Sequence, residues 1–363
     1  MNSNVNQNIA ICLPSLVPGG MENVAALLAN EFQHLISCQI HIVILSKKDV
    51  FFNLPNQVVV HKPDFEPKSN NFILDSIRLI GYLKRTIKKN NIKYCLSFSE
   101  RYNSIFILGC LLSGSRIVIS NRQNQLLSNG FMVDSLNKLF YRYSDGIIAQ
   151  TAFAKKIIFQ NYKHKNIIVI PNPVREVKSK PVDSRERWIL NVGRFSSKKN
   201  QYDLVNYFTE INNPTWYLYF LGDGFYRNLT DEAIEKSDLK SNVSILGFTK
   251  DTELYYKKAS IFAFVSRSEG FPNALAEAMA HGMAVISYDC IAGPSDLIDD
   301  GINGFLIPDG DSNLYKKRLT ELMHDADLRL RLGEAAAKKM RLFQSDVIAK
   351  KYLEAILGNE SNN

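Results

Sequence analysis

Two glutamates, Glu269 and Glu277, lie eight positions apart in the stretch SEGFPNALAEAMAHG, residues 268–282. Carboxylates accept hydrogen bonds from sugar hydroxyls, often two from one vicinal diol. Glu269 precedes a helix that is predicted to begin at Pro272 and to continue through residues 273–281, and Glu277 lies inside that helix. The helix is otherwise largely apolar, and a buried helix does not carry a carboxylate without a partner. The pair predicts a site for a hydroxyl-rich ligand; the alternative is a helix N-terminal charge and a surface glutamate.

The start of this helix has the features of an anion site. It follows an apolar strand predicted over residues 261–265, and Pro272 suits a first helical position. Gly282 suits the left-handed residue that ends a helix. The free N–H groups of the first turn would therefore point out of the carboxyl edge of a parallel sheet, where open α/β sheets bind their ligands.

Complementary cations occur in NVGRFSSKKNQYDLV, residues 191–205. Gly193 ends a predicted strand and lets a ligand approach the backbone, and Arg194 and Lys199 follow on the same loop. A guanidinium and an ammonium so placed can grip a diphosphate from two directions. A solvated turn with two basic residues is the alternative.

A second glycine turn lies near the start of the chain. Pro18, Gly19 and Gly20 separate the first predicted strand from its helix. Paired glycines allow a turn that a substrate could contact through main-chain N–H groups.

Alternating elements position these residues. Short apolar segments rich in β-branched residues alternate with helical patterns, which predicts a parallel α/β architecture. Strands are expected at 9–13, 40–45, 58–61, 94–98, 117–120, 146–149 and 167–170, with helices over 21–35, 73–89 and 135–143. IPNPVREVKSKPVDSRER indicates a linker, after which WILNVG, WYLYFLG, VSILGF, IFAFVS, AVISY and GFLIP predict further strands.

A chain of 363 residues is long enough for two domains. We predict one Rossmann-like domain over residues 1–172, a linker over 173–185 and a second Rossmann-like domain over 186–363. The helical segment 346–357 stays with the second domain or crosses back to the first, and the pattern leaves both open.

Composition points to a cytoplasmic protein. The chain is 45% hydrophobic and 22% charged, as in ordinary globular proteins. The first residues, MNSNVNQNIAICLP, lack a basic segment followed by a long apolar one, and no run approaches the length of a spanning helix. The five cysteines are scattered without a C-x-x-C pair, as expected for buried thiols rather than a zinc site.

Charge is divided unevenly along the chain. Residues 1–172 hold 19 Lys and Arg against 9 Asp and Glu, whereas residues 173–363 hold 25 against 27. Part of the basic excess lies in the predicted amphipathic helix around residues 77–93, where Ile77, Ile80, Leu83 and Ile87 recur at helical spacing. This helix has either a solvated basic face or a face directed at a membrane or polyanion. Nucleic acid is not expected as a partner, because the basic residues lack interleaved aromatics.

Taken together, these motifs resemble the retaining glycosyltransferases of family 4, which have the GT-B fold. The resemblance is carried by EGFPNALAEAMA with its E-x7-E spacing, NVGRFSSKKN, the Gly19-Gly20 turn, PNPV and GPSDLIDDGINGFLIPDGD, and it covers nearly the whole chain. It implies two Rossmann-like parallel-sheet domains that face one another across a cleft. The amino-terminal domain would bind the acceptor, and the carboxy-terminal domain would bind a nucleotide-sugar.

The resemblance also implies roles for single residues. Arg194 and Lys199 would contact the donor diphosphate, Glu269 the transferred sugar and Glu277 the ribose hydroxyls. Gly193 would lie beside the donor. So would the backbone N–H groups of the loop before the helix and of its first turn, at Gly270, Phe271, Asn273, Ala274 and Leu275; Pro272 belongs to the same stretch. Phe248 and Thr249 would contact the nucleobase, and Gly19 and Gly20 the diphosphate. Asn121 and Arg122, in VISNRQN, would face the acceptor.

The implied activity is transfer of a hexosyl group with retention of configuration. Cleavage of the sugar–phosphate bond leaves negative charge on the diphosphate, which Arg194, Lys199 and the helix terminus can stabilise. We expect neither a cofactor nor a metal, although Asp309-Gly310-Asp311 and Asp325-Ala326-Asp327 mimic a metal-binding D-x-D. The expected donor is a UDP-sugar such as a UDP-N-acetylhexosamine, and the expected acceptor is a lipid-linked saccharide or glycan of a surface polysaccharide such as O-antigen. A peripheral position on the inner face of the cell membrane, at an anionic surface, follows as a hypothesis from the charge partition.

Three other functions remain open. A dehydrogenase also has Rossmann-like domains, but no G-x-G-x-x-G follows the first strand. A nucleotide-sugar epimerase shares the two-domain architecture. A non-catalytic nucleotide-sugar-binding subunit would need no catalytic cations, so the complete set of Arg194, Lys199 and two glutamates weakens that reading.

Overall fold

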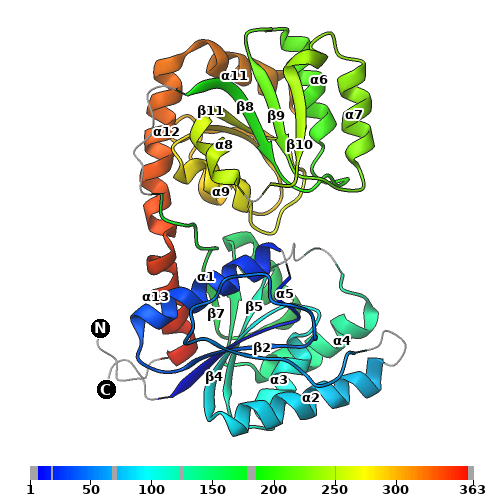
Figure 1. The fold of residues 1–363 in the computed structure, drawn as a ribbon, viewed down its shortest axis with the longest axis vertical. Coiled ribbons are helices and arrows are strands. Elements are labelled where there is room, and N and C mark those ends of the chain that lie inside the picture. Colours follow the sequence, from blue (N-terminus) through cyan, green and yellow to red (C-terminus); the bar gives the residue numbers. More distant parts are fainter. Residues whose placement is uncertain are drawn as a thin grey trace. The chain divides into compact units, whose positions relative to one another are not determined.

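The computed structural model describes residues 7–17, 19–67, 72–122, 126, 128–177, 185–249 and 251–358, and the chain divides into two compact units. Unit 1 comprises Met1–Pro173 with Ser345–Asn363, and unit 2 comprises Val174–Gln344. Most of the expected linker, residues 178–184, lies outside the described residues. Each unit is built on a parallel sheet flanked by helices (Figure 1).

Unit 1 contains a seven-stranded sheet in the order β3-β2-β1-β4-β5-β6-β7. Its strands are β1 Asn8–Leu13, β2 Ile40–Ile44, β3 Val59–His61, β4 Ile92–Phe98, β5 Arg116–Asn121, β6 Gly146–Ala149 and β7 Ile167–Val169. Its helices are α1 Gly20–Leu35, α2 Phe72–Lys89, α3 Asn103–Leu111, α4 Phe131–Phe140, the 3-10 turn η1 Tyr141–Tyr143, α5 Ala152–Tyr162 and α13 Ser345–Leu357.

The two faces of this sheet are covered by different helices. Side chains of α1 and α13 pack in one core with β1 and β2, and α2, α3 and α5 pack in another core on the opposite face. Figure 1 shows α1 and α2 on opposite sides of the sheet. Helix α2 lies close to α3, because a side chain at Gly109 would come within 2.7 Å of the Leu83 Cβ. Because α13 packs in the same core as α1, β1 and β2, the carboxy-terminal helix belongs to unit 1. This resolves the alternative that the sequence left open.

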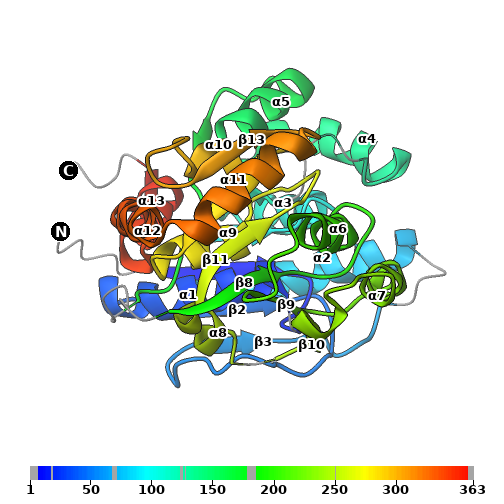
Figure 2. The same ribbon diagram turned by 90° about the horizontal axis from the view of Figure 1, so that it is seen from above.

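Unit 2 repeats this plan with six strands in the order β10-β9-β8-β11-β12-β13. Its strands are β8 Glu186–Val192, β9 Tyr217–Leu221, β10 Val243–Gly247, β11 Ala259–Phe264, β12 Ala284–Asp289 and β13 Phe305–Pro308. Its helices are α6 Gln201–Ile211, α7 Arg227–Glu235, α8 Thr252–Lys258, α9 Asn273–Ala280, α10 Pro294–Leu297, α11 Ser312–His324 and α12 Ala326–Met340, with 3-10 turns η2 Lys240–Asn242 and η3 Arg341–Phe343. Helices α6 and α7 lie side by side in both views (Figures 1 and 2).

The predicted fold class of two Rossmann-like parallel-sheet domains is confirmed, since each strand order follows the 3-2-1-4-5-6 pattern of doubly wound sheets. Two local expectations were wrong. Helix α4 begins at Phe131, and residues Tyr141–Tyr143 form a 3-10 turn. Ile77 is 62% exposed, because the buried side of α2 is formed by Leu79, Tyr82, Leu83 and Ile87. Within the described residues no helix has the length and apolar character to cross a membrane.

Candidate active site

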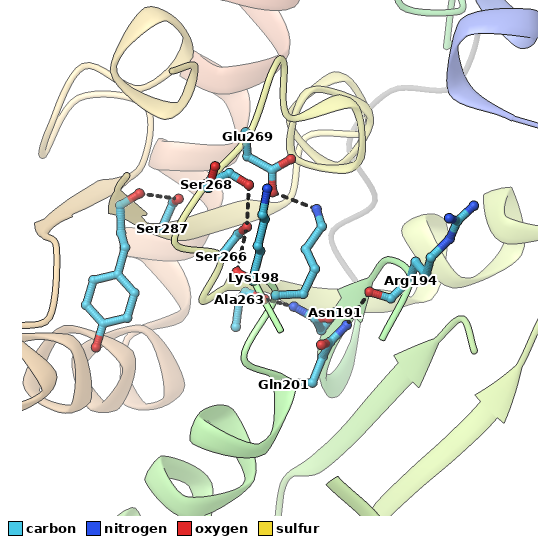
Figure 3. Close-up of polar contacts among 11 residues, drawn as sticks. Asn191, Arg194, Lys198, Gln201, Ala263, Ser266, Ser268, Glu269 and Ser287 are labelled. Carbon is cyan, nitrogen blue, oxygen red and sulfur yellow. Dashed lines mark hydrogen bonds and ion pairs between the residues drawn. The ribbon is translucent and has the colours of Figure 1, made fainter. Parts of the chain in front are cut away.

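The loops after β8 and β11 meet at the carboxyl edge of the unit 2 sheet. These two strands are neighbours, and the chain leaves them in opposite directions across the sheet, which makes this a topological switch point. The Lys198 carbonyl accepts hydrogen bonds from the Arg267 N–H at 2.8 Å and from the Ser266 hydroxyl at 3.3 Å. The loop over 193–200 and the loop over 265–272 are thereby tied together (Figure 3).

An ion pair joins the two loops. The Lys199 Nζ lies 2.6 Å from the Glu269 Oε1, and the two side chains are 22% and 10% exposed. The ammonium also lies 4.7 Å from the centre of the Phe264 ring. A charge pair at this depth is weakly screened, so each group orients the other. A diphosphate entering this edge would compete with Glu269 for Lys199, and a sugar hydroxyl would compete with Lys199 for Glu269.

Arg194 stands on the same loop as an exposed cation. Its carbonyl accepts a hydrogen bond from the Gln201 Nε2 at 3.3 Å, which fixes the backbone at the start of the loop. The guanidinium forms no ion pair with any residue in the described ranges. In Figure 3 its side chain extends away from Glu269. The backbone of Arg194 is thus held in place, whereas its guanidinium has no ion pair among the described residues and can move to contact a ligand.

Glycines end three neighbouring strands of unit 2. The Gly193 N–H donates to the Leu221 carbonyl at 2.9 Å, and the Gly222 N–H donates to the Gly247 carbonyl at 2.8 Å. A Cβ at Gly222 would lie 2.1 Å from the Gly193 oxygen, and its φ is +138°. Only glycine fits at Gly222 without displacing the backbone. Gly193 was predicted as part of the site from its position at a strand end, whereas Gly222 was not.

Helix α9 begins one residue later than expected. Pro272 is the residue before the helix, and no side chain caps the helix within the described residues. The loop is anchored by the buried Phe271 and by Gly293, where a Cβ would lie 2.4 Å from the Pro272 Cδ. The Asn273 N–H donates to the Phe271 carbonyl at 3.0 Å, so that group is already engaged. Gly270, Ala274 and Leu275 retain the positions from which their N–H groups could meet a ligand.

Glu277 is a half-buried carboxylate with a hydrogen-bond partner in the hydrophobic core. Its Oε2 accepts a hydrogen bond from the hydroxyl of the buried Tyr256 at 3.0 Å. Burial raises the pKa of Glu277, while the Tyr256 hydrogen bond and the charge of Arg175 lower it. Glu277 is therefore held in place by the fold, as its apolar sequence context predicted.

The nucleobase candidates lie on the loop after β10, which is the edge strand of the unit 2 sheet. Phe248 is exposed, and the Thr249 hydroxyl accepts a hydrogen bond from the Asp251 N–H at 3.1 Å. Gly247 before them has a φ of +73°, which turns the chain sharply at the strand end. An exposed ring beside a sharp turn is able to stack on a planar ligand.

The glycine turn of unit 1 accommodates a glutamate. Gly19 precedes α1 in an extended conformation, and Gly20 is the first helical residue. A Cβ at Gly19 would lie 2.2 Å from the Glu22 Oε2, so the side chain of Glu22 folds back over the turn. Burial raises the pKa of Glu22, and the nearby charge of Arg122 lowers it. The two glycines thus border a buried carboxylate that was not among the predicted site residues.

Arg122 is held by several groups of unit 1, whereas Asn121 lies in the interior. The Asn121 Oδ1 accepts hydrogen bonds from Asn103 and from Tyr141, which ties β5 to its neighbours. The Arg122 guanidinium lies 4.6 Å from the Phe98 ring centre and donates to the Tyr352 hydroxyl at 3.2 Å and to Asn172. Helix α13 thus helps to fix the orientation of Arg122.

Glu100 is a further candidate at the carboxyl edge of unit 1. It follows β4, which neighbours β1 at the switch point of this sheet. It is buried, and its carboxylate accepts the Arg122 N–H, while its carbonyl accepts a hydrogen bond from the Asn137 Nδ2 at 2.9 Å. The only sign of Glu100 in the sequence is an acidic residue directly after a buried strand. Its place in the candidate site, however, depends on the strand order.

The D-x-D mimics have structural contacts. Asp309 pairs with Arg267 at 2.8 Å, Asp311 accepts the Leu314 N–H at the start of α11, and Asp325 accepts the Leu328 N–H at the start of α12. The described residues hold no cluster of three metal-ligating side chains. These aspartates are thus explained by an ion pair and two helix caps.

Two family models match the chain. Glycosyltransferase Family 4 matches residues 18–177, and Glycosyl transferases group 1 matches residues 175–339. The two matches adjoin and divide the chain close to the boundary between unit 1 and unit 2.

Individual proteins show the same similarity. An uncharacterized glycosyltransferase of Methanocaldococcus jannaschii is 35% identical over 183 residues, which cover 46% of this chain and 45% of that protein. This chain thus matches about half the length of that relative. The N-acetylgalactosamine-N,N'-diacetylbacillosaminyl-diphospho-undecaprenol 4-alpha-N-acetylgalactosaminyltransferase of Campylobacter jejuni is 25% identical over 375 residues, covering 97% of this chain and 100% of that protein.

Among solved structures, S. aureus TarM in complex with fondaparinux, alpha-GlcNAc-glycerol and UDP has a TM-score of 0.82 with 14% identity. The match covers 97% of this chain and 100% of that chain. At this identity the likeness supports the fold alone.

Proposed function

Because the chain belongs to the GT-B glycosyltransferases of family 4, we propose that it is a retaining transferase that moves a sugar from a nucleotide diphosphate to a lipid-linked saccharide or glycan. The pairing of Lys199 with Glu269 at 2.6 Å carries this proposal. It sets a cation for phosphate beside a carboxylate for hydroxyls, next to the uncapped first turn of α9. A nucleotide-sugar needs this juxtaposition, because its diphosphate is bonded directly to its sugar.

The proposed donor is a UDP-N-acetylhexosamine. Lys199 and Arg194 bind the diphosphate, Glu269 binds the transferred sugar and Glu277 binds the ribose. The exposed ring of Phe248, with Thr249, contacts the nucleobase. The supporting contacts are the fixed loop of Arg194 and the hydrogen bond that orients Glu277 through Tyr256.

In the reaction, the bond from the sugar carbon to the diphosphate oxygen breaks and a bond to the acceptor oxygen forms on the same face. The acceptor proton passes to the departing phosphate oxygen, so no enzymic nucleophile is required. Negative charge grows on the diphosphate as the bond breaks, and Lys199, Arg194 and the α9 N-terminus stabilise it. We propose that these fixed charges suffice without a metal ion, so that a chelator leaves turnover unchanged.

The acceptor is proposed to meet the carboxyl edge of the unit 1 sheet. The buried carboxylates Glu22 and Glu100 and the guanidinium of Arg122 gather at this edge, and carboxylates accept bonds from an acceptor hydroxyl. The name of the Campylobacter relative describes transfer to a diphospho-undecaprenol-linked saccharide. That name supports a lipid-linked acceptor here, with the enzyme bound peripherally at an anionic membrane surface.

Donor hydrolysis without acceptor tests the proposal. Nucleotide-sugars are screened for slow release of the nucleotide, and the best donor is then incubated with lipid-linked saccharides and analysed by mass spectrometry for a product one sugar heavier. The anomeric proton of the product reports retention or inversion by NMR. Calorimetry that detected no binding of any nucleotide-sugar to the folded protein would refute the proposal.

A further inference from the structure

Arg185 lies at the edge of the unit 2 sheet that is opposite the candidate site. It directly precedes β8, whose other end leads into the Gly193 loop. Arg185 is half-buried, and within the described residues its guanidinium donates only to main-chain carbonyls. Burial lowers the pKa of Arg185 to about 10, so the guanidinium is still charged at neutral pH. A charged donor forms stronger hydrogen bonds to carbonyl oxygens than a neutral one.

The carbonyls that Arg185 contacts belong to the ends of two helices. Its Nη1 shares its hydrogens among the carbonyls of Tyr256 at 2.6 Å, Ala259 at 2.7 Å and Lys257 at 3.3 Å, at the end of α8. Its Nη2 donates to the carbonyl of His281, the residue that follows α9. The last carbonyls of a helix have no partner within the helix and carry the negative end of its dipole. One guanidinium therefore stabilises the carboxyl ends of both helices and joins them.

The two residues at these helix ends also hold Glu277. The Tyr256 hydroxyl donates to the Glu277 Oε2 at 3.0 Å and to the Ala274 carbonyl at 3.4 Å. The His281 ring stacks on the Tyr256 ring, with centroids 5.1 Å apart and planes at 22°. The His281 Nδ1 forms a hydrogen bond of 2.8 Å with the Glu277 carbonyl. Arg185 thus bonds to the main chain of both residues that contact Glu277.

We propose that Arg185 is a positioning residue for donor binding, which sets the Glu277 carboxylate at the ribose by joining the ends of α8 and α9. The inference rests on the proposed function, in which Glu277 binds the ribose hydroxyls. Arg185 acts from the far edge of the sheet and does not touch the ligand. The hydrogen bond from Tyr256 to Glu277 depends on the position of α8 relative to α9, and a shift of about 1 Å between the helices breaks it.

Unit 2 contains a matched control for these contacts. Arg329 of α12 is also half-buried, and its Nη1 donates to the carbonyls of Leu322 at 2.6 Å and Met323 at 3.3 Å, at the end of α11. Its guanidinium lies 5.2 Å from the centre of the Trp216 ring, and burial lowers its pKa as well. Helix α11 carries none of the residues assigned to the donor. Loss of Arg329 therefore removes a similar helix-end contact and leaves Glu277 in place.

Calorimetry with UDP and with 2′,3′-dideoxy-UDP, which lacks both ribose hydroxyls, tests the role of Arg185. Arg185→Gln should raise the Kd of UDP about tenfold and change the Kd of the dideoxy nucleotide less than about twofold, because the contact between Glu277 and the ribose is lost. Arg329→Gln should change neither value. Arg185→Lys keeps the charge and part of the hydrogen bonds, so its Kd for UDP should lie between those of Arg185→Gln and wild type. Equal weakening of both nucleotides in Arg185→Gln would overturn the proposal.

A double-mutant cycle checks that Arg185 acts through Glu277. In a Glu277→Ala background, Arg185→Gln should change the Kd of UDP less than about twofold, because residues that act through one another are not additive. In the transfer reaction, Arg185→Gln should raise the donor KM about tenfold and lower kcat less than about threefold. Additive effects in the cycle, or a loss confined to kcat, would contradict the proposed role.

Hydrogen exchange separates the helix contacts from the function. Arg185→Gln should speed the exchange of amides in α8 and α9, and Arg329→Gln should do so in α11. Where Arg185→Gln does not fold, Arg185→Lys carries the same tests with changes of the same sign. Unchanged exchange in α8 and α9, or unchanged UDP affinity, would refute the role of Arg185 and leave the transferase standing. Failure of the wild-type protein to bind any nucleotide would remove the proposed function and the role of Arg185 with it.

Discussion

The two units place different chemistry at the same topological position. In unit 2 the loops after β8 and β11 bring Lys199 and Glu269 into a 2.6 Å ion pair, with the exposed Arg194 beside it. In unit 1 the first turn of α1, which follows β1, carries the buried Glu22, and the loop after β4 carries the buried Glu100. Arg122 is held there by Phe98, Asn172 and Tyr352. The same strand order thus supplies a similar edge in both units, and the residues that follow the strands decide whether the edge suits a diphosphate or a hydroxyl group.

The largest expected effect comes from the unit 2 edge. Lys199→Ala should lower the turnover number about 100- to 1,000-fold, because a charge beside the leaving diphosphate is lost. Lys198→Ala is the matched control, since its side chain is exposed one position away and makes no ion pair with the described residues. The measurement is initial transfer rate at saturating donor. Turnover near that of wild type in Lys199→Ala would show that the leaving group is stabilised elsewhere.

Arg194→Ala belongs to the same test, with Arg187→Ala on the exposed part of β8 as its control. We expect a comparable loss for Arg194 and none for Arg187.

The unit 1 edge should respond in the acceptor step alone. Glu100→Gln keeps an oxygen that can accept the Arg122 N–H but loses the negative charge, and we expect about a tenfold fall in kcat/KM for acceptor. The donor dissociation constant and the rate of donor hydrolysis should not change. Tyr352→Phe, which removes one contact of Arg122, should raise the acceptor KM more mildly. If either variant weakened donor binding, the division of roles between the two edges would be wrong.

Donor affinity should depend on the ionisation of Glu277. Burial raises its pKa above the ordinary value of 4.5, so protonation begins at a less acidic pH than for an exposed glutamate. Because the carboxylate is the better acceptor for ribose hydroxyls, the donor dissociation constant should rise as pH falls through this pKa. Calorimetry over a pH series should show the dependence in wild type and its absence in Glu277→Gln. Tyr256→Phe removes the hydrogen bond that favours the charged form and should move the transition to higher pH.

The smallest expected difference concerns acid stability. In unit 1, His41 and His61 stack with ring nitrogens 2.9 Å apart, and burial followed by the His61 charge lowers the pKa of His41 from 6.5 to about 4. As the pH falls, His41 is therefore protonated in the unfolded chain before it is protonated in the folded protein. The stability that is present above pH 6.5 is lost as the pH falls. The loss between pH 7 and pH 5 should reach at most about 2 kcal/mol.

Optical probes separate the units in this experiment. Both tryptophans, Trp188 and Trp216, lie in unit 2. Tryptophan fluorescence therefore follows unit 2, while far-UV circular dichroism follows both units. Acid should lower the urea midpoint of the circular dichroism transition, and His41→Val should reduce that shift. A shift of equal size in His41→Val would assign it to other groups.

The sequence predicted the unit 2 edge well because its information is local. Glu269, Lys199 and Gly193 lie in short loops next to recognisable strands, and Pro272 predicts the start of the helix to within one residue. Gly222 escaped notice, because its need for glycine arises from the Gly193 oxygen on the neighbouring strand. Such a contact has no signature within its own segment.

The unit 1 edge depends on contacts between distant segments, which the sequence does not display. Glu100 becomes notable when β4 is known to neighbour β1, and Arg122 becomes ordered through Tyr352, 230 positions away. Asn121 lay at a correct strand end, but its side chain bonds inside the unit to Asn103 and Tyr141. Ile77 followed the helical period of α2 yet lies on its outer side, because Leu79, Tyr82 and Leu83 form the buried stripe.

The return of α13 to unit 1 governs how this polypeptide can be divided. Ile348, Tyr352 and Ile356 are buried in the same core as α1 and β1. A fragment that stopped at Pro173 would leave that apolar surface bare to water and prone to aggregate. Unit 2 is an insertion between two pieces of unit 1, so excising Val174–Gln344 and rejoining the flanks is the division that keeps each hydrophobic interior intact.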